Sequence, residues 1–289
     1  VVKIVSALYR DHGIRDNRRK ARLGHLITKW GLEKFKEEVE TGLGYTLQDA
    51  TRNDFTPYAK REHFGVHTSK MDGISYIGCA VNGGSIKAQG LEELANILEK
   101  HNATTIKTTT TQNFVILDAP STSTDALVKD LEAINIDANP NPFKARTLSC
   151  TGMQFCKFGI SETKNAAISL ASHLHQKFPD FDETVSISLN GCPNSCAHPS
   201  IVDIGLSGTK FKDENGETIV GFDLFLGGTL EGDQSRYAQN MKVKIKPEDV
   251  NTKVEKIITS YIESSKNEIG LFLKDLEEDD TFTIDNLKQ

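Results

Sequence analysis

The segments Cys150-Thr-Gly-Met-Gln-Phe-Cys156 and Gly191-Cys-Pro-Asn-Ser-Cys196 decide how the second half of this 289-residue chain is built. Each holds two cysteines among glycine, proline or asparagine, which are residues that favour loops. Two short loops brought together can present four thiolates in a tetrahedral array, and this array is the ligand set of a [4Fe–4S] cluster. The spacing therefore favours one cluster held by both loops.

Other uses of the cysteines stay open at this point. Four cysteines also suit a structural zinc site, although zinc loops usually separate their paired cysteines by roughly two to four residues. Disulfides are disfavoured, because the chain has five cysteines and its first residues carry no export signal. The fifth, Cys79, lies in the apolar run Ile74–Val81, so we expect it to be a small buried hydrophobic residue.

Length and charge narrow the class of protein. At roughly 150 residues a domain, we expect more than one domain. The net charge of −6 argues against a dedicated nucleic-acid-binding protein. No apolar run approaches the roughly 18 residues that a membrane span needs. We expect a cytoplasmic protein without membrane or nucleic-acid partners.

The first half of the chain has helical and mixed patterns. Asp16 or Asn17 can cap a helix that runs toward Trp30, and Gly31 interrupts the pattern before it resumes. Residues 43–62 are rich in turn formers and indicate a linker. The pattern then predicts strands at 74–81 and 104–117 that alternate with helices at 91–101 and 125–134. This order suggests an α+β sandwich of ferredoxin-like type.

A second domain is expected after Asn139-Pro-Asn-Pro142. Its first cysteine loop leads into a helix at about 162–178, and a strand at 185–189 leads into the second loop. Asn215-Gly216 predicts a hairpin turn between strands at about 201–211 and 218–226. Helices are expected from Pro247 and from about Asn267. Both cysteine pairs thus follow the ends of regular elements.

Further motifs extend along the chain from the two cysteine loops. They are Asn17-Arg-Arg-Lys-Ala-Arg22, Gly65-Val-His67, Thr109-Thr-Thr-Gln-Asn113, Ser161-Glu-Thr-Lys164, Asp203-Ile-Gly205 and Gly221-Phe-Asp-Leu-Phe-Leu-Gly-Gly228. In this order and spacing, the whole set resembles the assimilatory nitrite and sulfite reductases, which carry a [4Fe–4S] cluster coupled to sirohaem. The resemblance covers nearly the entire chain.

The resemblance implies a domain plan. Family members normally have two similar halves, and this chain resembles the second half with the helical end of the first. We expect a helical end and linker at 1–60, a ferredoxin-like half-domain at 61–138, and a mixed α/β domain for cluster and sirohaem at 139–289. The chain opens at Val1 rather than at methionine, so we expect a segment of a longer product, inactive or nearly so by itself.

The resemblance also implies roles for single residues. Cys150, Cys156, Cys192 and Cys196 are expected to ligate the cluster, and the Cys196 thiolate is expected to bridge to the sirohaem iron. Hydrogen bonds to sirohaem are expected from Thr109, Gln112 and Asn113. Arg18 and Arg22, one helical turn apart, suit its carboxylates, and a solvated helix face or a contact with the missing half is an equal alternative. The backbone amide of Asn194 is expected to point at the cluster sulfurs.

The reaction implied by the resemblance is the six-electron reduction of nitrite to ammonia or of sulfite to sulfide, with a slight preference for nitrite. Ferredoxin is the expected electron donor and a flavoprotein the second choice, because the chain shows no nucleotide-binding glycine motif after a strand. The missing first half is a further expected partner. The competing hypothesis is a cofactor-free or zinc-stabilised binding or scaffold module. An RNA-binding domain would need more strand aromatics than Tyr76 and Phe114.

Overall fold

The computed structural model describes residues 1–51, 54, 63–264, 266 and 268–278. The chain divides into two compact units, residues 1–56 and 57–289. Half of the linker expected at residues 43–62 lies outside the described residues, and the domain boundaries expected near 60 and 138 stay predictions. No described helix is long and apolar enough to cross a membrane.

The first unit is helical. It contains α1 (Val2–His12), a 3-10 helix at Arg18–Lys20, α2 (Leu23–Trp30) and α3 (Leu32–Leu43). The expected single helix toward Trp30 is wrong, because the chain extends between the 3-10 helix and α2. Asn17 does cap this segment, since its side chain accepts a hydrogen bond from the Arg19 amide. Gly31 separates α2 from α3 with a φ of 84°, a conformation that favours glycine.

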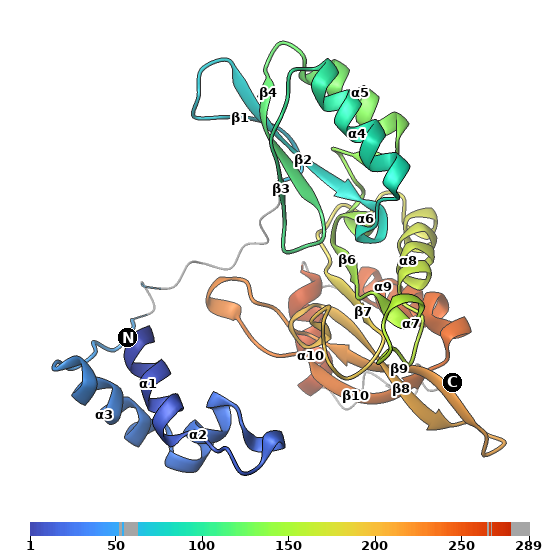
Figure 1. The fold of residues 1–289 in the computed structure, drawn as a ribbon. Helices are drawn as coiled ribbons and strands as arrows, with labels where there is room; N and C mark the ends of the chain where they lie inside the picture. Colours follow the sequence, from blue (N-terminus) through green and yellow to red (C-terminus); the bar gives the residue numbers. More distant parts are fainter. Residues whose placement is uncertain (52–53, 55–62, 265, 267, 279–289) are drawn as a thin grey trace. The chain divides into compact units, whose positions relative to one another are not determined.

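The second unit begins with an antiparallel sheet (Figure 1). Its strands run in the order β1-β2-β4-β3, and β5 also pairs with β2. The strands are β1 (Gly65–Thr68), β2 (Ile74–Val81), β3 (Ile106–Thr108), β4 (Phe114–Pro120) and β5 (Ile136–Asp137). Helices α4 (Ala88–Lys100) and α5 (Thr124–Ala133) share one hydrophobic core with the sheet. The α+β, ferredoxin-like prediction is confirmed.

One expected strand is wrong in its extent. Residues 104–117 form β3 and part of β4, which are joined by a tight turn. Gln112 has a φ of 60° there, and its amide donates to the Thr109 carbonyl oxygen at 3.3 Å. Strand propensity alone does not reveal this turn, because threonine also favours strands.

A second sheet follows, in the order β10-β9-β8-β7-β6. Strands β6 (Thr147–Ser149), β7 (Ile187–Asn190) and β8 (Ile204–Lys212) are parallel to one another. Strands β9 (Thr218–Leu226) and β10 (Gln239–Ile245) extend the sheet with antiparallel pairing. The predicted hairpin at Asn215-Gly216 is confirmed, because β8 and β9 pair up to that turn.

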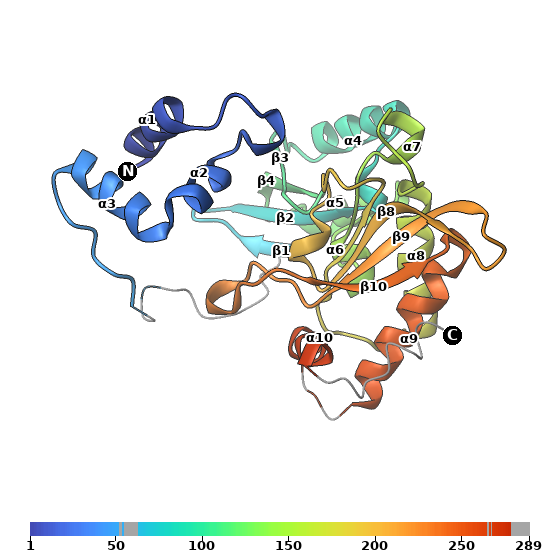
Figure 2. The ribbon, with the colours of Figure 1, turned by 90° about the horizontal axis from the view of Figure 1, so that it is seen from below.

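Helices cover this second sheet. The helices that follow the first sheet in the chain are α6 (Pro142–Arg146), α7 (Gly152–Phe155), α8 (Lys164–Lys177), α9 (Val250–Glu263) and α10 (Ile269–Glu278). Short 3-10 helices lie at Asn82–Gly84, after β2, and at Pro199–Ile201, Gly232–Gln234 and Pro247–Asp249. Helix α8 buries Ala167, Leu170, Ala171 and Leu174, a spacing that makes one apolar face. Figures 1 and 2 show α8 and α9 against the sheet, whose buried strands complete the core.

Candidate functional site

The two cysteine loops leave the same edge of the second sheet. Cys150 directly follows β6, and Cys192 follows β7 after one glycine. These strands are neighbours and parallel, with Ser149 opposite Leu189, so their carboxyl ends lie together. The Cys150 amide continues the ladder by donating to the Leu189 carbonyl oxygen at 3.0 Å. The expectation that both pairs follow regular elements is confirmed.

Glycines allow the two loops to approach closely. A methyl group on Gly191 would lie 2.9 Å from the Ser161 carbonyl oxygen and 3.5 Å from the Cys150 sulfur. On β8, a methyl group on Gly208 would lie 2.4 Å from the Gly191 carbonyl oxygen. Both close neighbours are backbone atoms that cannot move aside without shifting a loop. The loop geometry therefore requires hydrogen in place of a side chain at these positions.

Backbone amides point at the sulfur of Cys150. The Gly152 amide lies 3.3 Å from Sγ, and the Gly191 amide lies 3.1 Å from it. One amide comes from each cysteine loop, so this sulfur also links the loops. Hydrogen bonds of this kind favour a sulfur that carries negative charge, as a metal-bound thiolate does.

Asn190, at the end of β7, holds the second loop. Its carboxamide oxygen accepts a hydrogen bond from the Ala197 amide at 2.7 Å, and its amide nitrogen donates to the Cys192 carbonyl oxygen at 3.2 Å. Ser188 adds a hydrogen bond from its hydroxyl to the Ala197 carbonyl oxygen. Asn190 is 1% exposed, so these contacts are shielded from water. Sequence reasoning missed this residue, whose only signal is a polar side chain where the strand meets the loop.

The four thiols differ in exposure. Cys192 is buried, Cys150 and Cys156 are half-buried, and Cys196 is exposed, and none of them forms a disulfide. Among the described residues, no three histidine, cysteine, aspartate or glutamate side chains are gathered closely enough to hold a metal ion. The complete set of four ligands thus stays a prediction. The chemistry of the thiols and amides does fit a thiolate-bound cluster.

A cavity of about 660 Å³ joins one cysteine of each pair, because Cys150 and Cys196 both line it. Gln112, Ser149 and Lys164 also contribute to its wall. The Ser149 hydroxyl is completely buried and lacks a hydrogen-bond partner among the residues that the structure describes. An unpaired buried hydroxyl beside a cavity is the situation in which a bound group can supply the missing hydrogen bond.

Lys164 begins α8 beside the first cysteine loop. Its ammonium donates to the carbonyl oxygens of Gly83 at 2.7 Å and Ser149 at 3.1 Å. Burial lowers the pKa of this ammonium, and the neighbouring charge of Cys150 opposes that change. The sequence motif contained this lysine, but it was not assigned a role.

The residues expected to bind sirohaem through the Thr109–Asn113 turn have other partners here. Gln112 donates to the Ser149 carbonyl oxygen at 2.8 Å and accepts from the Ser149 amide at 3.2 Å. Asn113 is buried, accepts from the Val81 amide at 2.9 Å and donates to the Ala145 carbonyl oxygen at 3.0 Å. Thr109 accepts from the Asn113 amide at 3.1 Å. A hydrogen bond from Asn113 to a cofactor would have to replace one of its contacts, whereas Gln112 uses only one of its two amide hydrogens in the contacts described.

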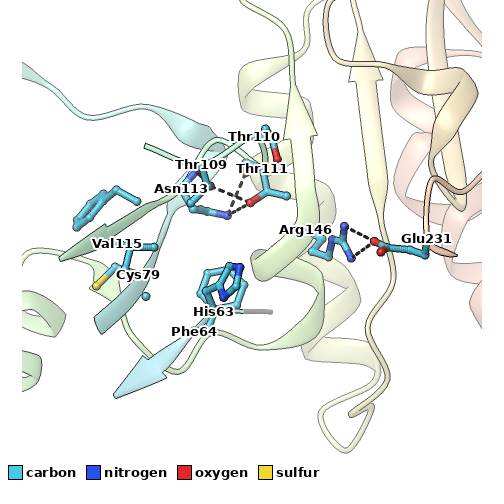
Figure 3. A pocket seen from close by; sticks show the side chains of 12 residues that line it. His63, Phe64, Cys79, Thr109, Thr110, Thr111, Asn113, Val115, Arg146 and Glu231 are labelled. Atoms are coloured by element: carbon cyan, nitrogen blue, oxygen red, sulfur yellow. Dashed lines mark hydrogen bonds and ion pairs between the residues drawn. The ribbon is translucent and has the colours of Figure 1, made fainter. Parts of the chain in front are cut away.

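A smaller pocket of about 220 Å³ lies on the other side of this turn (Figure 3). Thr109, Thr111 and Asn113 line it, and Figure 3 shows the Arg146 guanidinium facing the Glu231 carboxylate. That ion pair is 3.2 Å long. Among the described residues that line this smaller pocket, the only cysteine is Cys79, which is completely buried as expected. The larger cavity, which Cys150 and Cys196 line, is therefore the better candidate for redox chemistry.

The remaining predicted residues are Asn194, Arg18 and Arg22. Asn194 is exposed on the second cysteine loop. Arg18 and Arg22 belong to the first unit, where both are exposed. The expectation that they lie one helical turn apart is wrong, because Arg18 lies in the 3-10 helix and Arg22 has an extended backbone before α2. Their role toward a cofactor stays a prediction.

Comparison with known proteins agrees with the site. The model of the nitrite and sulphite reductase 4Fe-4S domain matches residues 1–47 and 142–271, and that of the nitrite/sulfite reductase ferredoxin-like half domain matches residues 67–134. A ferredoxin–nitrite reductase of Synechococcus elongatus is 34% identical over 79% of this chain and 44% of its own length. Sulfite reductase [ferredoxin] 1 of Mycolicibacterium paratuberculosis is 33% identical over 91% of this chain and 48% of its own.

A solved structure shows the same architecture. The NirA protein of Mycobacterium tuberculosis superposes with a TM-score of 0.82 and 29% identity, over 95% of this chain and 52% of that one. The chain thus spans about half the length of the relatives that it matches. From its cysteine loops, its two sheets and these matches, the chain belongs to the nitrite and sulfite reductase family.

Proposed function

We propose that this chain is the cluster-bearing half of a reductase that converts nitrite to ammonia or sulfite to sulfide with six electrons. The observation that carries the proposal is the pair of cysteine loops at one sheet edge, with an amide from each loop on the Cys150 sulfur. The relatives named as ferredoxin-dependent nitrite and sulfite reductases support the reaction class. The Thr-Gly that follows Cys150 favours nitrite slightly.

The four paired cysteines are the proposed ligands of a [4Fe–4S] cluster. Cys150 and Cys192 are fixed by their strands, while Cys156 and Cys196 lie farther along their loops. Cys196 is exposed and lines the larger cavity, which suits a thiolate shared with a second cofactor. Sirohaem, when bound, would supply the iron to which the substrate anion binds.

Backbone and side-chain groups of the protein stabilise negative charge on the proposed cluster ligands and hold their loops in place. Amides of Gly152 and Gly191 stabilise negative sulfur at Cys150, and Asn190 keeps the second loop in register with its strand. Thr109 and the Gln112–Ser149 hydrogen bonds form one wall of the cavity. We assign to Asn194, Arg18 and Arg22 further contacts with the cluster or with sirohaem carboxylates, as the family resemblance implies.

Ferredoxin is the proposed electron donor, since the relatives are named for it. The first cysteine loop offers a surface for such a partner. Met153, Phe155 and Phe158 are 55%, 77% and 60% exposed, and Cys156 lies among them. Exposed methionine and aromatic side chains are typical of interface centres. Lys157, over the Phe158 ring at 5.2 Å, adds a positive charge that suits an acidic donor.

The same proposal covers the rest of the enzyme. The substrate-gripping cations are assigned to the other half, so the chain alone would be inactive or nearly so. We further propose that the enzyme works in the cytoplasm, where thiols stay reduced, in keeping with five cysteines that form no disulfide.

The test is the visible absorption spectrum of the chain purified without oxygen. Broad sulfur-to-iron absorption with porphyrin-type bands is expected for the wild type. Cys196→Ala should lose both features, whereas Cys79→Ala, which removes a thiol outside both pairs, should keep them. A colourless wild type with one bound zinc would overturn the cluster assignment in favour of a zinc-stabilised module.

A further inference from the structure

Lys164 holds a positive charge beside the first cysteine loop, and among the described residues no carboxylate accepts a hydrogen bond from it. Both acceptors of its ammonium, the carbonyl oxygens of Gly83 and Ser149, are neutral. The side chain is half-buried, so water screens its charge only in part. Because its hydrogen-bond acceptors are neutral, the ammonium charge is not cancelled locally and can interact with other charged groups nearby.

The proposed cluster ligand Cys150 is one such group, since Lys164 and Cys150 interact electrostatically. Ser149, which accepts from the Lys164 ammonium, directly precedes it. Thr163, the residue before Lys164, donates its hydroxyl to the Cys150 carbonyl oxygen at 2.7 Å. Lys164 and Cys150 line the same cavity. The start of α8 therefore brings its lysine to the wall from which the first cysteine projects.

We infer that the charge of Lys164 raises the reduction potential of the cluster. This inference rests on the proposed function. Accepting an electron adds one negative charge to the cluster, and a cation beside it stabilises the reduced form more than the oxidised form. The N-terminus of α8 contributes a partial charge of the same sign, although the Glu162 carboxylate accepts hydrogen bonds from its Asn165 and Ala166 amides. Lys164 thus contributes a whole unit of positive charge here, in contrast to the partial charge of the helix N-terminus.

A purely structural role makes a different prediction. The hydrogen bonds of Lys164 connect the Asn82–Gly84 turn with the end of β6, and any side chain that loses them would loosen this contact. Such loosening changes stability with little dependence on the charge of the replacement. The charge effect, in contrast, separates replacements of similar length by their charge alone.

The experiment is a redox titration of the cluster in the anaerobically purified chain, followed by electron paramagnetic resonance. Lys164→Gln keeps a donor but removes the charge, and Lys164→Arg keeps the charge. Lys177→Gln is the matched control, since Lys177 ends the same helix about 20 Å away. We expect a lower midpoint potential for Lys164→Gln, and wild-type values for Lys164→Arg and Lys177→Gln.

Each outcome decides the inference. Equal potentials in wild type and Lys164→Gln, or equal shifts in Lys164→Gln and Lys164→Arg, overturn it. If Lys164→Gln holds no cluster while Lys164→Arg holds one, the charge is required for cluster assembly rather than for setting the potential, and the inference fails. If neither variant holds a cluster, the role is a shape-specific contact and the inference fails. A wild-type chain without a cluster would instead refute the proposed function.

Discussion

Replacing Asn190 by alanine removes the side chain that fixes the second cysteine loop to its strand. The carboxamide makes one hydrogen bond to the Ala197 amide and one to the Cys192 carbonyl oxygen, at opposite ends of the loop. No water can replace these partners easily, because Asn190 and Ala197 are each 1% exposed. Asn190→Ala therefore leaves a buried amide and a buried carbonyl without this partner.

The size of the effect follows from these two bonds. A hydrogen bond contributes about 0.5–1.5 kcal/mol net, so losing two lowers the free energy of opening the loop by about 2 kcal/mol. Because 1.4 kcal/mol corresponds to a factor of ten, the population of the open loop rises about 30-fold. The remaining contacts of Ser188 and Gly208 keep the loop closed most of the time.

The rate at which a thiol reagent labels Cys192 in the cluster-free chain measures this opening. Cys192 is buried, so it reacts only when the loop opens, whereas exposed Cys196 reports the intrinsic reaction. Peptide mapping by mass spectrometry separates the two thiols. We expect Asn190→Ala to label Cys192 about 30-fold faster, with Cys196 nearly unchanged. Asn165→Ala, an exposed position on α8, is the control and should match the wild type.

An unchanged Cys192 labelling rate in Asn190→Ala would refute the reasoning, because the loop would then be held by contacts other than the carboxamide. Equal acceleration of Cys192 and of buried Cys79 would refute it differently. That result would mean that the substitution destabilises the whole second unit, since Cys79 lies in the other sheet.

Three further predictions follow from the same structure. Gly208→Ala places a methyl group 2.4 Å from the Gly191 carbonyl oxygen, so we expect the free energy of unfolding to fall by about 1–3 kcal/mol and the iron content to fall as well. Gly24→Ala, whose methyl group meets open space, is the control and should keep its iron. In Gln112→Asn, asparagine can adopt the positive φ, but its shorter side chain cannot reach the Ser149 backbone. Urea unfolding should show a free energy of unfolding lower by about 1–2 kcal/mol, and an unchanged midpoint would contradict this. Burial raises the pKa of the Cys79 thiol to about 12 from an ordinary value of 9.0. The contribution of the neutral thiol to folding stability is therefore complete below pH 9.0 and is lost as the pH rises toward 12. The stability difference between wild type and Cys79→Ala should therefore shrink by up to about 1.4 kcal/mol per pH unit above 9.0, and parallel pH curves would contradict it.

The sequence predicts those parts of the fold that local patterns control. The helical spacing of Ala167 to Leu174 and the turn at Asn215-Gly216 need no distant partner, and both elements lie where they were expected. Strand β6 has only three residues, and the turn at 109–113 begins with three threonines, which favour strands. Their form depends on partners far along the chain, such as Leu189 for the ladder and Ser149 for Gln112.

The candidate site divides in the same way. Cysteine spacing predicts the two loops, because one cluster can take its four ligands from two such pairs. It does not predict Asn190 or Gly208, whose importance appears only when β7 and β8 lie side by side. For Arg18 and Arg22 the sequence predicted too much. Their spacing suggested one helical turn, but the backbone is extended at Arg22, before α2.

In the proposed metal centre, the two cysteines of each loop would have different tasks. Cys150 and Cys192 follow strand ends, and backbone ladders and glycine packing fix their main chains before any metal binds. Cys156 and Cys196 lie farther out, and Cys196 is exposed. In the proposed cluster, the outer two thiols would join a strand-end pair whose main chain is already held by these contacts. Contacts that hold the loop ends therefore determine how little ordering the cluster must impose when it binds. For this reason the effect of Asn190→Ala should appear in the cluster-free chain, before iron content is measured at all.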